Sequence, residues 1–166
     1  LSQQLPLVKQ LLTLMGITVL EKEGFEADDI LGTLSAACSE KNIQCSILTG
    51  DRDSLQLIDE NVTVRLATNK DTILYTPDKF IEDYGFQPIN LIDLKALMGD
   101  SSDNIKGVPG VGEKAAAALI SAYGTIEALY DAIRDADDVK KKEINQYWKQ
   151  ELGLSRSPMA YLLKED

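Results

Sequence analysis

Residues 43–53, which read IQCSILTGDRD, contain the clearest strand signal of the chain. The first six are mostly apolar, include β-branched side chains and are stopped by Thr49 and Gly50, a pattern typical of a buried parallel strand. Asp51 and Asp53 follow at once, so the strand delivers both carboxylates from its carboxyl end. Open α/β sheets bind ligands in the crevice beside such strand ends. The segment therefore predicts an α/β core with an acidic ligand-binding edge.

Hydrophobic spacing on both sides of this strand predicts the other elements. Before it we expect a helix over residues 5–15, a strand over 17–20 and a helix over 26–41. After it we expect strands over 62–67 and 72–76, joined by a turn, and then helices over 77–84 and 88–98 that each begin with proline. No strand is expected after residue 77. The chain should combine an α/β core over residues 1–76 with a helical subdomain over 77–166.

The amino-acid composition limits the expected location of the protein and the kinds of catalytic site it can contain. The 166 residues are 44% apolar, without an apolar run long enough to span a membrane and without the order of a secretion signal at the start, so we expect a cytoplasmic protein with no membrane partner. The absence of histidine excludes Ser-His-Asp and Cys-His nucleophilic schemes and most catalytic zinc sites. Cys38 and Cys45 lie in apolar stretches and are expected to be buried thiols. The net charge of −10 alone argues against a nucleic-acid partner, although the position of the charge matters more than its sum.

Seven acidic residues fall into three tight clusters. They are Glu26, Asp28 and Asp29 at the start of the helix over 26–41, Asp51 and Asp53 after the strand, and Asp100 and Asp103 after the helix over 88–98. Each cluster also has a purely structural interpretation, because acidic residues cap helix starts and line solvated turns. Several close carboxylates are nevertheless hard to ionise together unless a cation lies among them. Their co-occurrence predicts a metal centre.

The type of donor indicates which metal and which reaction. Oxygen ligands without histidine favour Mg²⁺ or Mn²⁺ over zinc. Two such ions about 3.5–4 Å apart are the usual clamp for phosphodiester hydrolysis, in which one activates water and the other stabilises the leaving oxygen. The residues thus predict metal-assisted phosphoryl transfer to water.

Residues 105–114, which read IKGVPGVGEK, form a glycine-rich loop before an apolar helix. Glycines at a helix start let backbone N–H groups approach a phosphate, and the helix terminus adds positive potential. A plain turn between two helices is the alternative. The loop lacks the Gly-Lys-Ser/Thr ending of a nucleotide-binding Walker motif. We expect instead a helix-hairpin-helix grip on the backbone of duplex DNA, without base preference. Its residues would be Lys106, Gly107, Val108, Gly110, Val111, Gly112 and Lys114.

Together these motifs resemble the 5′-3′ exonuclease domain of bacterial DNA polymerase I, in the flap endonuclease superfamily. The resemblance rests on EADD at residues 26–29, TGDRD at 49–53, GDSSDN at 99–104 and the glycine loop, in the family's order and at similar spacing. It covers nearly the whole chain. It implies a PIN-like or resolvase-like core followed by a helical subdomain of the helix-hairpin-helix type.

The resemblance also implies roles for the acidic residues and the loop. Glu26, Asp28, Asp51 and Asp53 would be catalytic and hold one metal ion, Asp100 and Asp103 would complete a second site, and Asp29 would be a ligand or lie just behind one. The loop would bind duplex DNA and a monovalent cation such as K⁺. Substrates would be DNA with a 5′ flap or a nick, and RNA primers, in replication and repair. In a longer protein a polymerase domain would be fused to this one.

The family begins with a strand that carries a metal-binding aspartate, followed by a helical arch, and the resemblance starts after both. We therefore expect a fragment or truncated homologue that binds metal and duplex DNA but cuts weakly or not at all alone. Two alternatives stay open. One is a duplex-binding module without chemistry. The other is a magnesium-dependent phosphatase of the haloacid dehalogenase type, because residues 51–53 and 99–104 resemble two of its motifs.

Overall fold

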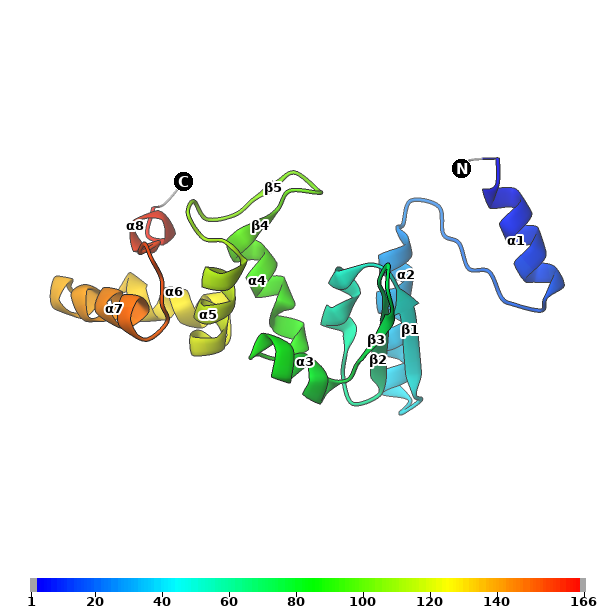
Figure 1. The fold of residues 1–166 in the computed structure, drawn as a ribbon, viewed down its shortest axis with the longest axis horizontal. Helices are drawn as coiled ribbons and strands as arrows, with labels where there is room; N and C mark the ends of the chain where they lie inside the picture. Colours follow the sequence, from blue (N-terminus) through cyan, green and yellow to red (C-terminus); the bar gives the residue numbers. More distant parts are fainter. Residues whose placement is uncertain (1–2, 165–166) are drawn as a thin grey trace.

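A computed structural model describes residues 3–164 and shows an α/β part followed by a helical part (Figure 1). The α/β part contains α1 (Leu5–Leu14), α2 (Ala27–Glu40), β1 (Cys45–Thr49), the 3₁₀ helix η1 (Arg52–Leu57), β2 (Val62–Ala67) and β3 (Thr72–Tyr75). The sheet has the order β1-β2-β3, with β1 parallel and β3 antiparallel to β2. This confirms the predicted parallel pairing and the hairpin that follows it. The expected burial of the strand is wrong except at Ile47, because Leu48 is exposed.

The central strand shows why these residues form a sheet. Val62, Val64 and Leu66 alternate with more exposed neighbours and are buried, as expected of a strand with one face on the core. α2 packs against β1, and η1 contacts α2, β2 and α4. Because η1 contacts both helices, the residues that directly follow β1 are held between α2 and α4.

The helical part continues from β3. It contains α3 (Pro77–Tyr84), η2 (Pro88–Asn90), α4 (Leu91–Met98), α5 (Glu113–Tyr123), α6 (Ile126–Arg134), α7 (Asp138–Gln150) and α8 (Met159–Leu162). Its core includes the fully buried Leu119, Leu129 and Trp148, and the Trp148 indole N–H donates a 2.9 Å hydrogen bond to the Tyr123 hydroxyl. The helices between residues 3 and 164 are each too short or too polar to cross a bilayer.

Two expectations about strands are wrong. Residues 17–20 form no strand; they lie in an extended segment between α1 and α2, with Ile17 and Leu20 exposed, and α1 stands apart from the sheet (Figure 1). A strand needs a partner for its backbone groups, which local β-propensity cannot supply. Conversely, two-residue strands β4 (Gly99–Asp100) and β5 (Ile105–Lys106) pair antiparallel after residue 77.

The β4–β5 pairing depends on two glycines that lie against each other. A Cβ on Gly107 would come within 2.2 Å of the Met98 carbonyl carbon and 2.3 Å of the Gly99 nitrogen. Gly99 itself has a φ of +78°, which side chains of L-residues rarely adopt. The Val108 N–H donates to the Leu97 carbonyl at 2.8 Å and continues the contact. The turn that carries Asp100 and Asp103 is therefore fastened to the end of α4 and to the start of the glycine loop.

Candidate carboxylate site and glycine loop

Asp51 and Asp53 are placed by the start of η1. Asp51 is its N-cap, and the Asp51 Oδ1 accepts a 2.9 Å hydrogen bond from the Asp53 backbone N–H. The Asp53 carbonyl accepts from the Gln56 side chain at 2.9 Å. One aspartate thus caps the turn and the other lies inside it. Asp53 is half-buried and faces α4, whereas Asp51 is exposed.

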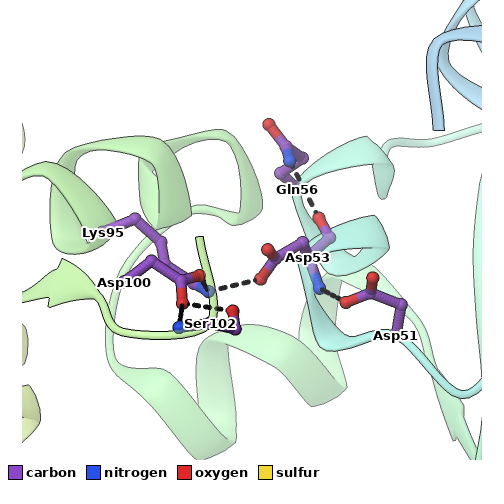
Figure 2. Close-up of polar contacts among 6 residues, drawn as sticks. All are labelled: Asp51, Asp53, Gln56, Lys95, Asp100 and Ser102. Carbon is purple, nitrogen blue, oxygen red and sulfur yellow. Dashed lines mark hydrogen bonds and ion pairs between the residues drawn. The ribbon is translucent and has the colours of Figure 1, made fainter. Parts of the chain in front are cut away.

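Lys95 on α4 forms ion pairs with both Asp53 and Asp100 (Figure 2). Its Nζ lies 2.7 Å from the Asp53 Oδ1 and 2.5 Å from the Asp100 Oδ2. Burial alone lowers the pKa of Lys95, but its hydrogen bonds to Asp100 and Asp53 outweigh this and raise the pKa. Sequence reasoning missed Lys95. The only signal for it was a lysine within an apolar helix, a feature that many surface helices share.

Asp100 lies in the turn between β4 and β5. Its Oδ1 accepts hydrogen bonds from the Ser102 backbone N–H at 2.9 Å and from the Ser102 hydroxyl at 2.5 Å. Lys95 and Ser102 together hold the pKa of Asp100 well below its usual range. Asp103 is exposed in the same turn.

The first acidic cluster caps α2. The Asp29 Oδ2 accepts a 2.9 Å hydrogen bond from the Glu26 backbone N–H, as one half of a capping box. The pKa of Asp28 is raised by burial first and then by the neighbouring Asp51, Asp53 and Asp29. Asp28 lies on α2, yet its charged form is repelled by the carboxylates of Asp51 and Asp53 at the start of η1. Glu26 is exposed at the start of α2.

Two cavities meet at Asp53 and Gln56. One, of about 340 Å³, lies toward α4 and is lined by Lys95, Asp100 and Asp103 among others. The other, of about 350 Å³, lies toward α2 and is lined by Asp28 and Asp29 among others. Of the seven predicted metal residues, five thus line two adjoining cavities, and Glu26 and Asp51 lie outside both linings.

The donor set fits a divalent cation in type but not in its present arrangement. All the candidate donors are carboxylate oxygens, as a hard cation requires. The hydroxyl of Ser54, next to Asp53, is buried without a hydrogen-bond partner among the described residues and lines the cavity toward α2. Yet within residues 3–164 no three histidine, cysteine, aspartate or glutamate side chains are placed so that they could hold a metal ion. Between Asp53 and Asp100 the cation in this structure is the ammonium group of Lys95.

The glycines of the loop over residues 105–114 differ in what surrounds them. Gly107 is required by its contact with Met98 and Gly99, as described above. Gly110 has a φ of +83° in a turn, and a Cβ on Gly110 or Gly112 would meet nothing within 4 Å. Gly112 is the N-cap of α5 and provides no side-chain cap. The backbone at the start of α5 is therefore open to an incoming group.

The other residues of the loop divide into anchors and charges. Val111 is buried in the core and Val108 packs against it, so both hold the loop in place. Lys106 and Lys114 are exposed, and neither forms an ion pair with another described residue. The loop thus presents open backbone and two positive charges on a chain whose net charge is −10.

Two protein-family models match consecutive parts of the chain. Residues 1–85 match the model of the 5′-3′ exonuclease N-terminal resolvase-like domain, and residues 86–158 match that of the 5′-3′ exonuclease C-terminal SAM fold. The chain belongs to the 5′-3′ exonuclease family. The predicted fold class is confirmed, and no part of the match supports a haloacid dehalogenase.

The relatives of this chain include bacterial DNA polymerases I. The chain is 39% identical to the enzyme of Bacillus caldotenax over 169 residues, covering 99% of this chain and 19% of the relative. It is 44% identical to the thermostable DNA polymerase I of Thermus filiformis over 144 residues, covering 87% of this chain and 17% of the relative. The chain therefore spans less than a fifth of the length of these relatives.

Two solved structures share the fold. The T5 D15 protein, co-crystallised with metal ions, superposes with a TM-score of 0.64 at 23% identity, over 92% of this chain and 55% of its own. The catalytic core of Rad2 in complex with a DNA substrate superposes with a TM-score of 0.56 at 18% identity, over 91% of this chain and 50% of its own. At these identities the likeness establishes the fold alone.

Proposed function

We propose that this chain is the part of a structure-specific 5′-3′ exonuclease or flap endonuclease that grips duplex DNA and carries most of the metal-binding carboxylates. The enzyme hydrolyses phosphodiester bonds of DNA or RNA primers in replication and repair. Its substrate is duplex DNA with a 5′ flap or a nick, and in the longer protein a polymerase domain is its neighbour. Family membership and the carboxylates gathered around Asp53 support this proposal.

The proposed cofactors are two Mg²⁺ or Mn²⁺ ions. Glu26, Asp28, Asp29, Asp51, Asp53, Asp100 and Asp103 are the proposed ligands. When bound, such ions supply an activated water and stabilise the leaving oxygen. Related T5 nuclease structures contain bound metal ions, including zinc, which supports a divalent cation in general. The choice of Mg²⁺ or Mn²⁺ rests on the all-oxygen donor set.

The proposed DNA grip is the loop over residues 105–112 with the start of α5. Open backbone at Gly110 and Gly112 lets phosphates approach the N–H groups, and Lys106 and Lys114 add attraction. A K⁺ ion bound by loop carbonyls belongs to the same proposal. Such contacts recognise the phosphate backbone and not the bases.

The chain alone is proposed to bind DNA and to cut it weakly or not at all, because the carboxylates form no ready metal site in the described residues. The test uses a fluorescent 5′-flap duplex with Mg²⁺ or Mn²⁺, and the Asp51→Asn/Asp100→Asn double variant as control. Asparagine keeps a hydrogen-bond acceptor for the Asp53 and Ser102 N–H groups and removes the charge. We expect flap binding by both proteins and only slow, metal-dependent cutting by the parent.

Three outcomes are informative. Cutting that disappears in the double variant supports the nuclease. Cutting by the double variant equal to that of the parent would contradict the assigned carboxylates. Tight duplex binding with no cutting under any metal, even when this chain is joined to the family's metal-binding strand and helical arch, would favour a duplex-binding module without chemistry.

A further inference from the structure

Lys95 forms ion pairs with two carboxylates that come from different elements. Among the described residues it is the only lysine or arginine that forms an ion pair with a predicted metal ligand, and it does so with two of them at once. Asp53 comes from η1 and Asp100 from the β4–β5 turn, so the ammonium group connects two separate elements. Figure 2 shows it between the two carboxylates.

The distances around the Lys95 ammonium group are close to those that a divalent cation would need. The two oxygens that face Lys95 can be no more than 5.2 Å apart, the sum of 2.7 and 2.5 Å. A magnesium ion that bound both oxygens at about 2.1 Å would need them within about 4.2 Å. The two oxygens are therefore at most about one ångström farther apart than a small divalent cation could bridge, and a monovalent cation already lies between them.

We infer that Lys95 is a built-in counterion that stands in for a divalent cation between Asp53 and Asp100 and competes with it for this position. This inference rests on the proposed function, because it assumes that the two aspartates bind metal. Two cations cannot share the same pair of oxygens without strong repulsion. Metal binding there requires the Lys95 side chain to leave.

The surroundings leave room for the Lys95 side chain to move away. The Lys95 side chain is 32% exposed and lines the cavity of about 340 Å³, so its flexible stem has room to turn away. After it leaves, Ser102 still donates to the Asp100 Oδ1, and the Asp53 backbone N–H still donates to the Asp51 Oδ1. Only the two oxygens that face Lys95 are released.

The consequence is a reduced metal affinity in the parent protein. When binding requires a state with fractional population, the apparent dissociation constant rises by the inverse of that fraction. A bridge that is closed nine-tenths of the time therefore weakens metal binding about tenfold. Removal of the ammonium group should strengthen metal binding, whereas damage to a merely structural ion pair would weaken it.

The test is calorimetric titration of MnCl₂ into the full chain, without DNA, for the parent, Lys95→Met, Lys95→Arg and Lys79→Met. Methionine keeps the apolar stem without the charge, and arginine restores the charge. Lys79 is the matched control because it also bridges two carboxylates, Glu82 and Asp83, on α3. We expect binding about tenfold tighter for Lys95→Met, and within about threefold of the parent for the other two variants.

Thermal melting provides a second measurement. Lys95→Met should melt below the parent without metal, and the difference should shrink or reverse in MnCl₂. Equal or weaker Mn²⁺ binding by Lys95→Met, or a melting deficit that Mn²⁺ does not reduce, would overturn the inference and leave the proposed nuclease intact if the parent binds Mn²⁺. If neither the parent nor Lys95→Met binds Mn²⁺, the proposed metal site itself fails, and the inference fails with it.

Discussion

Replacement of Gly107 by alanine tests the link between the glycine loop and the acidic turn. The added Cβ would lie 2.2 Å from the Met98 carbonyl carbon, 2.3 Å from the Gly99 nitrogen and 2.5 Å from the Met98 oxygen, whereas ordinary contact begins near 3.4 Å. All three atoms are backbone, so no side-chain rotation relieves the overlap. Overpacking costs about 1–3 kcal/mol where neighbours can move. We therefore expect a loss of about 3 kcal/mol or more of the free energy of unfolding.

The matched control is Gly112→Ala, in the same loop. A Cβ there meets nothing within 4 Å, and the φ of −96° is open to alanine. Its stability should stay within about 1 kcal/mol of the parent, because a poorer N-cap and a less flexible unfolded chain roughly offset each other. Urea unfolding followed by circular dichroism measures both variants. A Gly107→Ala protein as stable as Gly112→Ala would refute the packing role of Gly107.

Three further predictions concern charge and packing. Asp28→Asn should raise the melting temperature at pH 7, because burial and neighbouring carboxylates raise the pKa of Asp28 and so disfavour its charged form in the folded protein. This gain should vanish as the pH falls through 3.8, the pKa of the carboxyl group in the unfolded chain. An equal gain at pH 7 and pH 3 would contradict the prediction. Tyr123→Phe should lower the free energy of unfolding, measured in urea, by about 1–3 kcal/mol, because it leaves the buried Trp148 N–H without its acceptor. A change within about 0.5 kcal/mol would count against that hydrogen bond. Lys114→Ala should reduce the slope of log affinity for duplex DNA against log salt by about 1, and an unchanged slope would remove Lys114 from the DNA contact.

The sequence predicted the elements whose signals are local. β1 follows from an apolar run stopped by glycine, β2 and β3 from two such runs around a turn, and α3 from a proline in its first turn. The predicted strand over residues 17–20 failed because a strand is stable only beside another strand, and pairing partners are not encoded locally. β4 and β5 were missed for the same reason, since their pairing depends on the approach of Gly99 to Gly107.

The sequence predicted some residues of the candidate site and missed others. Aspartates at the carboxyl end of a strand are a positional signal, and it led to Asp51 and Asp53. Lys95 has no such signal, because its role depends on the distance between α4 and η1 in the fold. The glycine motif identified the loop but could not separate Gly107, which packing requires, from Gly110 and Gly112, which leave open space.

Structural and metal-binding roles of these carboxylates need not exclude each other. A carboxylate has two oxygens with about four acceptor positions, and a cap or turn occupies only some of them. Asp100 shows this directly, because its Oδ1 accepts from Ser102 while its Oδ2 faces Lys95. Asp51 uses Oδ1 to cap η1, and Asp29 uses Oδ2 within the capping box of α2. Capping at these positions therefore fixes the carboxylates in place, and a fixed carboxylate loses less freedom when it binds a cation.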